Sequence, residues 1–123
     1  MKYDNGKLQS NILFEDFPLA LREVAAVATY GAVKYERSSW KGVPNCEVRY
    51  GDAKARHVIE QGIGEFDEES ELYHLAHEAW NCFALLQLKL EEQTNEQILT
   101  RYQKSFGKAA EAKKKQMELF NGS

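Results

Sequence analysis

The sequence predicts an all-α fold, a compact bundle of about four to five helices with an irregular N-terminal arm and a long loop after the first helix. Two observations lead to this fold class. Apolar residues recur at three- and four-residue spacing between residues 72 and 86, as they do along one face of a helix. Residues that start helices, such as Asp16 with Pro18, and residues that stop them, such as Gly62 with Gly64, border the helix-prone segments.

The N-terminal arm is a stretch of about 15 residues without sustained periodicity. It contains the turn-prone residues Asp4, Asn5 and Gly6, so we expect an irregular segment packed over the body of the protein. A first helix is expected over residues 17–35. The Asp16 side chain can accept hydrogen bonds from free backbone N–H groups there, and the proline that follows is tolerated in a first helical turn.

A loop is expected over residues 36–49, because Gly42 and Pro44 interrupt regular structure there. Loops of this length inside a domain are often functional. A second helix fits residues 50–61 and ends before the two glycines that follow.

The strongest periodicity predicts a helix that starts near Ser70 and packs centrally. Its apolar face consists of Leu72, Leu75, Ala79, Cys82, Phe83 and Leu86. The tail over residues 95–120 is also helix-prone. We expect a break at Gly107, and we expect the lysines at 113, 114 and 115 on the exposed side.

The composition is that of a single small domain. The chain has 123 residues, a formal net charge of −3, 43% hydrophobic residues and 28% charged residues. No apolar run approaches the ~20 residues that cross a bilayer, and the polar start resembles no signal peptide. We therefore expect a cytoplasmic protein without membrane or nucleic-acid partners, in which Cys46 and Cys82 are reduced thiols.

One polar stripe runs along the helix that starts near residue 70. Its members, spaced so that they share one face, are His74, His77, Glu78 and Asn81. Imidazoles and carboxylates bind several divalent metals, and Mg²⁺ or Mn²⁺ is favoured where oxygen ligands dominate. The alternative is a solvated outer face with helix-supporting side-chain pairs.

A second stripe combines cations with a histidine on the expected helix over residues 50–61. It consists of Arg49, Ala53, Arg56, His57 and Glu60. Arginine is suited to phosphate because its planar guanidinium can donate two hydrogen bonds at once. The alternative is ordinary surface salt bridging, which is worth ~0–1 kcal/mol per pair.

Possible ligand groups also lie on the first helix and just beyond it. Glu23 could reach a metal and Lys34 a phosphate. Tyr30, Tyr35 or Trp40 could stack on a base, a contact worth ~1–3 kcal/mol. Each aromatic residue could equally belong to the core.

An acidic stretch follows the second expected helix, and it consists of Glu65, Asp67, Glu68 and Glu69. These residues could bind a metal, or they could be first-turn carboxylates favoured by the dipole of the next helix. The sequence contains no P-loop, GxGxxG, GxSxG or HExxH motif. The nucleotide or hydrolase folds that carry those motifs are therefore not indicated.

Six short motifs in one order resemble a known family. They are Lys2-Tyr3-Asp4-x-Gly6-Lys7, Tyr30-Gly31-Ala32-x-Lys34-Tyr35, Trp40-x-Gly42, Asp52-Ala53-x-x-Arg56-His57, Gly64-Glu65-x-Asp67-x-Glu69-Ser70 and His74-Leu75-Ala76-His77-x-Ala79-x-Asn81. In this order they resemble the phage dATP/dGTP diphosphohydrolase family, N-terminal domain. The resemblance covers roughly residues 1–90, for which it implies a nucleotide-handling helical domain. Residues 91–123 would be a helical extension, packed on that domain or at an oligomer interface.

The resemblance implies a relation to the MazG-like all-α nucleoside triphosphate pyrophosphohydrolases, which hold Mg²⁺ or Mn²⁺ with acidic residues from neighbouring helices. The EExxE and ExxD arrangement of those enzymes is absent, and the nearest match is Glu78-x-x-Asn81. Two further departures are Ser39, where the family tends to have Asn, and Glu71-x-Tyr73, where it tends to have Gly and Pro.

The leading hypothesis is a metal-dependent enzyme that releases pyrophosphate from a purine (deoxy)nucleoside triphosphate. The expected metal ligands are Glu23, Glu65, Asp67, Glu69 and Glu78, and the candidate general bases are His57, His74 and His77. The expected substrate-binding residues are Lys7, Tyr30, Lys34, Tyr35, Trp40, Arg49, Arg56 and Asn81. We expect a homo-oligomer, because the family's relatives often complete their sites across subunits.

Two other hypotheses stay open. The first is a non-catalytic protein that sequesters a nucleotide or a nucleotide signal, for example a phage protein that counters host defence. It is motivated by the missing EExxE and ExxD carboxylates. The second is an interaction module whose C-terminal helix is a packed tail or a dimer seam, formed by the apolar residues Ile98, Leu99, Tyr102, Phe106, Met117 and Phe120. Catalytic turnover would separate the enzyme from the binder.

Overall fold

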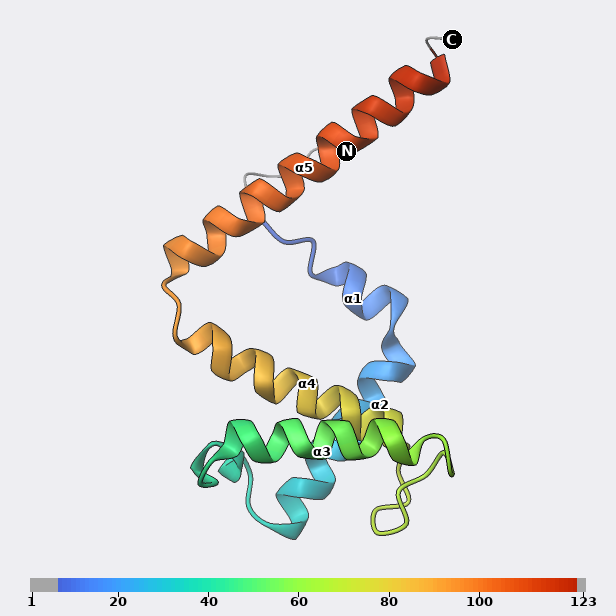
Figure 1. Cartoon of the computed structure of the whole chain (residues 1–123), viewed down its shortest axis with the longest axis vertical. Helices are drawn as coiled ribbons and strands as arrows, with labels where there is room; N and C mark the ends of the chain where they lie inside the picture. Colours follow the sequence, from blue (N-terminus) through green and yellow to red (C-terminus); the bar gives the residue numbers. More distant parts are fainter. Residues whose placement is uncertain (1–6, 122–123) are drawn as a thin grey trace. The chain divides into compact units, whose positions relative to one another are not determined.

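The computed structural model describes residues 7–121, and these residues contain α-helices and no strand (Figure 1). The helices are α1 (Asn11–Asp16), α2 (Pro18–Lys34), α3 (Cys46–Glu60), α4 (His74–Glu91) and α5 (Asn95–Asn121), with a short 3₁₀ turn η1 (Ser39–Gly42). The predicted all-α class is therefore confirmed. No helix within the described part of the chain is both long enough and apolar enough to cross a membrane.

The chain divides into two units. One runs from Asn11 to Lys89 and holds α1, α2, α3 and nearly all of α4. Among the described residues, the other unit comprises residues 7–10 and 90–121, which contain α5. The packing predicted for the C-terminal extension stays a prediction.

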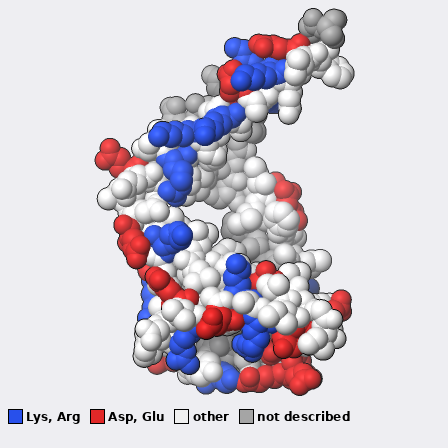
Figure 2. All heavy atoms as spheres, in the orientation of Figure 1, with Lys and Arg blue, Asp and Glu red and all other residues white. Residues whose placement is uncertain are grey.

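Helix α5 is continuous where the sequence predicts a break. Gly107 lies inside it, and that expectation was wrong because one glycine costs a helix only about 1 kcal/mol relative to alanine. The lysines at 113, 114 and 115 are exposed, as predicted. Figure 2 shows Lys and Arg side chains along α5 on the face in view, with acidic side chains among them, and both signs of charge also mix over the other unit.

The N-terminal arm is more regular than predicted. Residues 11–16 form helix α1, and the Phe17 N–H donates to the Leu13 carbonyl at 3.1 Å to join it to the next segment. Pro18 is then the first residue of α2, the position at which its missing N–H is not needed. The predicted turn residues Asp4, Asn5 and Gly6 lie outside the described residues.

The expected loop over residues 36–49 is shorter than predicted. It contains the turn η1, and α3 begins at Cys46, four residues before the predicted start at Tyr50. Asn45 has a left-handed backbone (φ 54°), which asparagine tolerates better than most residues and which turns the chain into the helix. The Tyr50 hydroxyl donates to the Trp40 carbonyl at 2.5 Å and ties η1 to α3.

Helix α4 begins at His74 because the residues before it form a closed turn, which we call the 65–74 loop. Phe66 and Tyr73 make an isolated antiparallel bridge, and their rings lie 4.4 Å apart. The Asp67 N–H donates to the Leu72 carbonyl at 2.8 Å, and the His74 N–H donates to the Glu65 carbonyl at 2.8 Å. These bonds hold Asp67 beside the first turn of α4.

The buried face of α4 is not the one the sequence predicts. Leu75 is 62% exposed, and Phe83 and Leu86 are about half exposed, whereas the buried residues are His74, Ala76, Asn81 and Ala84. The polar stripe therefore faces inward. Within the described residues every buried side-chain nitrogen or oxygen has a hydrogen-bond partner, which removes the main cost of burying polar groups.

One residue of the 65–74 loop has a strained backbone. Glu71 has φ 62°, a left-handed conformation that glycine adopts at no steric cost. We predict that Glu71→Gly raises the free energy of unfolding in urea by up to about 1 kcal/mol. The control is Glu68→Gly, at an exposed position outside the left-handed residues, which should lower stability by about 0.5–1 kcal/mol. Equal losses in both variants would contradict the prediction.

Candidate functional site

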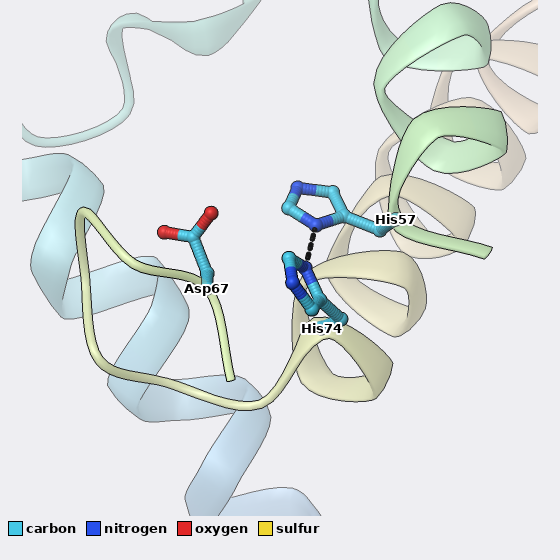
Figure 3. Close-up of side chains that lie close together, drawn as sticks. All are labelled: His57, Asp67 and His74. Carbon is cyan, nitrogen blue, oxygen red and sulfur yellow. Dashed lines mark hydrogen bonds between the residues drawn. The ribbon is translucent and has the colours of Figure 1, made fainter. Parts of the chain in front are cut away.

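A cluster of three histidines lies between α3 and α4. His57 near the end of α3 and His74 at the start of α4 are 4% and 6% exposed, and their Nδ1 atoms lie 2.8 Å apart (Figure 3). His77, one turn further along α4, stacks on His57 with ring centroids 4.6 Å apart and an interplanar angle of 8°. One of the two facing Nδ1 atoms must donate and the other accept, so at least one ring nitrogen of the pair is unprotonated.

The 65–74 loop brings a carboxylate to this cluster. The Asp67 carboxylate accepts the Ser70 N–H at 2.8 Å, and its Oδ2 lies 3.9 Å from Nε2 of His77. That same Nε2 lies 2.7 Å from the Ser70 hydroxyl. Asp67, Ser70 and His77 therefore form a connected polar network at the edge of the histidine pair.

Three of these side chains have the geometry of a metal-ligand group. His57, Asp67 and His74 each offer one ligand atom, and these atoms lie within 4.8 Å of one another. Figure 3 shows the Asp67 carboxylate coming from the loop opposite the two imidazoles, which come from the two helices. In residues 7–121 no other group of three histidine, cysteine or acidic side chains comes this close together.

Burial sets the protonation of the cluster. The pKa of His57 is lowered to about 4, chiefly by burial and then by the nearby positive charges of His77, Arg56 and His74. Burial is also the largest cause that lowers the pKa of His77. Burial raises the pKa of Asp67, but hydrogen bonds from Ser70 and the charge of His77 outweigh it, so the net shift is downward. At neutral pH the site therefore combines unprotonated His57 and His77 with an ionised carboxylate.

The lowered pKa of His57 makes stability depend on pH. The folded pKa of about 4 lies below the ordinary 6.5, so the unfolded chain binds this proton more readily. The stabilisation is complete above pH 6.5 and is lost as the pH falls toward 4. We predict that the urea midpoint of the metal-free protein falls between these pH values, and falls less in His57→Gln, which keeps a hydrogen-bonding side chain. Parallel pH profiles for the two proteins would contradict this.

A second network involves residues that the sequence singled out. Lys34 forms an ion pair with the Glu69 carboxylate, which also accepts the Tyr30 hydroxyl at 3.0 Å. These hydrogen bonds lower the pKa of Glu69, and the bond to Glu69 raises the pKa of Lys34. The Tyr30 ring meets His77 edge-on, with centroids 6.5 Å apart. The network connects α2 to the 65–74 loop and to the histidine cluster.

An aromatic cluster lies where side chains of η1, α3 and α4 meet. Trp40, Tyr50 and Trp80 pack edge to face, with centroid distances between 5.4 and 5.9 Å. Beside it is a cavity of about 460 Å³. The lining residues are Ser38, Trp40, Lys41, Trp80, Phe83, Ala84 and Gln87. An aromatic wall with a cation and an amide nearby is suited to a planar base.

The predicted metal ligands do not all gather at one place. Asp67 joins the histidines, whereas Glu69 is held by Lys34 and the Glu78 carboxylate accepts the Gln61 amide at 2.7 Å. Glu23 is half-buried and Glu65 is exposed, and neither belongs to the ligand group with His57 and His74. Metal binding by these glutamates stays a prediction.

The predicted substrate-binding residues are spread over the chain. Tyr35, Arg49 and Arg56 are exposed, and the charge of Arg56 acts on His57 and His77. Lys7 is exposed and belongs to the other unit. The Asn81 side chain is buried and donates to the His77 carbonyl at 2.8 Å, so it supports the helix turn that carries the cluster.

The sequence reasoning missed several residues of the site. Ser70 contacts both Asp67 and His77, and its signal was the Asp67-x-x-Ser70 spacing, in which the aspartate accepts a backbone N–H three residues later. Tyr50 and Trp80 complete the aromatic cluster with Trp40. Their spacing along the chain carries no comparable signal.

Comparison with known proteins gives one informative match. A family model described as dATP/dGTP diphosphohydrolase, N-terminal, matches residues 1–98 of the 123. No curated protein matches the chain, and no solved structure matches it. The predicted relation to the MazG-like enzymes stays a prediction.

Proposed function

Because the chain belongs to the dATP/dGTP diphosphohydrolase N-terminal family, we propose that it hydrolyses dATP or dGTP to the deoxynucleoside monophosphate and pyrophosphate. The family's name supports nucleotide hydrolysis. The reaction is placed at the group formed by His57, Asp67 and His74, and this group is the observation that supports the placement. His77 stacks on His57 beside it. Buried imidazoles beside an ionised carboxylate are suited to metal binding and proton transfer.

The proposed reaction is a single displacement at phosphorus. A water oxygen forms a bond to the α-phosphorus, and the bond from that phosphorus to the bridging oxygen breaks. Pyrophosphate leaves with the electron pair, and one water proton passes to a base. His77 is the best placed of the three histidines, because it is only partly buried and its Nε2 contacts the Ser70 hydroxyl near Asp67, whereas His57 and His74 are buried against each other. The Asp67 charge would stabilise the imidazolium that forms.

Two cations can hold the triphosphate. Arg56 is exposed next to His57, and its guanidinium can donate two hydrogen bonds to phosphate oxygens. Lys34 can exchange its contact with Glu69 for a phosphate oxygen, since this ion pair is partly exposed and therefore weak. The aromatic cavity beside Trp40 and Trp80 is our proposed purine site, where stacking would contribute about 1–3 kcal/mol.

A divalent cation, when bound, would neutralise the triphosphate and polarise the attacked phosphorus. Mg²⁺ and Mn²⁺ are the ions expected from the sequence. The donor set of two imidazoles and one carboxylate fits Mn²⁺, which accepts nitrogen ligands, better than Mg²⁺, which prefers oxygen. The chain's own part is to hold the ion with this set and to offer His77 to the water proton.

One observation favours the alternative of a nucleotide-sequestering protein. Glu69 and Glu78, two of the expected ligands, are engaged by Lys34 and Gln61, so the described residues do not assemble a cluster of carboxylates. A protein that only binds would need the cations and the aromatic wall but no activated water. It would also tolerate loss of His77.

The test measures pyrophosphate release under two conditions, one with nucleotide in excess over protein and one with protein in excess over nucleotide. Metal-stripped protein is incubated with dATP, dGTP, the other dNTPs and NTPs, with Mn²⁺ or Mg²⁺ added, and pyrophosphate release is followed. Many turnovers on dATP or dGTP, stopped by a chelator, are the expected result. Nucleotide uptake that stops at one equivalent, with no pyrophosphate even in protein excess, would overturn the hydrolase and support sequestration.

A further inference from the structure

We propose that His57, Asp67 and His74 bind a transition-metal ion such as Zn²⁺, Co²⁺ or Mn²⁺. We also propose that this site discriminates against Mg²⁺. The use of the ion in catalysis rests on the proposed function, but the site itself does not. Nothing in the spacing of the motifs places these three residues in one ligand set, because two helices and a loop must meet to form it.

The chemistry of the donors selects the class of metal. Two of the three ligands are imidazoles, which suit transition metals such as zinc and iron, whereas Mg²⁺ is bound through oxygen atoms and keeps several of its waters. A single carboxylate cannot supply the oxygen-rich shell that Mg²⁺ requires. The affinity of such a site rises from Mn²⁺ through Co²⁺ to a maximum at Cu²⁺ and falls from there to Zn²⁺.

The two histidine nitrogens are already nearly as far apart as in a filled site, whereas the Asp67 oxygen, within 4.8 Å of the histidine ligand atoms, would have to move closer. Two ligand nitrogens that each lie about 2.0–2.1 Å from one ion are roughly 2.9–3.4 Å apart, for angles between octahedral and tetrahedral. The Nδ1 atoms of His57 and His74 lie 2.8 Å apart. The pair would have to open by only a few tenths of an ångström, and the contact between the rings would be replaced by two metal bonds.

The surroundings hold the ligands in position. The His74 N–H bonds the Glu65 carbonyl and the Asp67 N–H bonds the Leu72 carbonyl, so both ends of the 65–74 loop are fixed before any ion arrives. The Ser70 N–H bonds the Asp67 carboxylate and orients it. Such partners of the ligands raise metal affinity by about 10- to 100-fold in other proteins. Three protein ligands also leave positions open for water or phosphate.

The competing explanation is a purely structural histidine pair, in which the two rings bond only to each other. Metal titration of the full chain, stripped with a chelator, separates the two. Calorimetry with Zn²⁺ is expected to show one site, with Mg²⁺ binding there at least about 100-fold more weakly. Zn²⁺ affinity is expected to fall at least about 100-fold in His74→Gln and in Asp67→Asn. The matched carboxylate control, Asp52→Asn on the exposed face of α3, should bind Zn²⁺ as the wild type does.

Zinc binding that neither substitution weakens would overturn the proposal, as would equal affinity for Mg²⁺ and Zn²⁺. If the ligand variants fail to fold, nitrogen NMR of histidine-labelled wild-type protein decides instead. Zn²⁺ should shift the ring nitrogens of two histidines, and the same two should shift in His77→Gln. Shifts confined to His77, or no shifts, would contradict the site. A confirmed zinc site without hydrolysis would contradict the proposed function alone. Hydrolysis that survives loss of both ligands would contradict the use of the ion in catalysis, whereas the site itself is contradicted only by the binding results.

Discussion

Replacing His77 with glutamine is expected to lower kcat for dGTP or dATP hydrolysis by about 100- to 10,000-fold, the usual contribution of a positioned general base. The amide keeps a polar group beside the Ser70 hydroxyl but cannot accept the water proton. His77 also stacks on His57, yet the buried contact between His57 and His74 does not depend on it, so the fold should persist. Steady-state pyrophosphate release and circular dichroism on the same samples measure both effects.

The control for this variant is Lys89→Gln, which changes an exposed residue near the far end of α4. It should keep wild-type turnover. An unchanged kcat in His77→Gln, with helix content preserved, would remove His77 from the reaction and leave its neighbours to accept the proton. A loss of helix content parallel to the loss of turnover would show that its role is structural.

Replacing Asp67 with asparagine is expected to reduce turnover by more than about 100-fold, because the substitution removes both a metal ligand and the charge beside His77. The asparagine side-chain oxygen can still accept the Ser70 N–H, so the 65–74 loop should keep its turn. The variant therefore removes the negative charge of residue 67 while the loop keeps its conformation. Turnover is measured at saturating and at limiting metal, since a weakened site is partly rescued by excess ion.

Asp52→Asn is the control, because it removes a carboxylate of equal size from an exposed position on α3. It should be indistinguishable from the wild type at every metal concentration. Wild-type turnover in Asp67→Asn at limiting metal would exclude the carboxylate from the site. The result would shift attention to Glu23, Glu65, Glu69 and Glu78, the other carboxylates that the sequence proposes.

The helices could largely be predicted from local signals. Pro18 marks the start of α2, and the glycines after α3 mark its end, because both act within a few residues of themselves. The break at Gly107 could not be judged in this way, since one glycine weakens a long helix without ending it. Helix α4 begins at His74, four residues after the predicted start near Ser70, for a related reason. The bonds that delay it join residues up to nine positions apart, as from His74 to Glu65.

The face of α4 that packs inward could not be read from periodicity alone. An apolar stripe predicts burial, but here the stripe with His74 and Asn81 is buried and the stripe with Leu75 is exposed. The deciding contact is between His74 and His57, which lie 17 positions apart. That pairing gives the Nδ1 atom of each ring a hydrogen-bond partner, which lowers the free-energy cost of burying the two side chains. Periodicity carries no information about such a partner.

The site could be predicted in part. All three histidines were singled out, and the structure brings them together through α3 and α4. The five candidate carboxylates were equivalent in the sequence, because their spacing does not reveal how the 65–74 loop folds back. The loop places Asp67 beside His57 and His74, whereas Glu69 forms an ion pair with Lys34. The same folding of the loop also places Ser70 in the site, where its hydroxyl contacts His77.

Phosphorus NMR of reactions of the wild-type chain with excess dGTP and Mn²⁺, recorded after a chelating resin has removed the paramagnetic ion, tests the central claim most directly. It resolves every phosphorus of the substrate and products in one spectrum. We predict that pyrophosphate and dGMP appear in equal amounts over many turnovers, and that dATP behaves in the same way. Release of inorganic triphosphate or of single phosphates, or a spectrum of unchanged nucleotide, would contradict it.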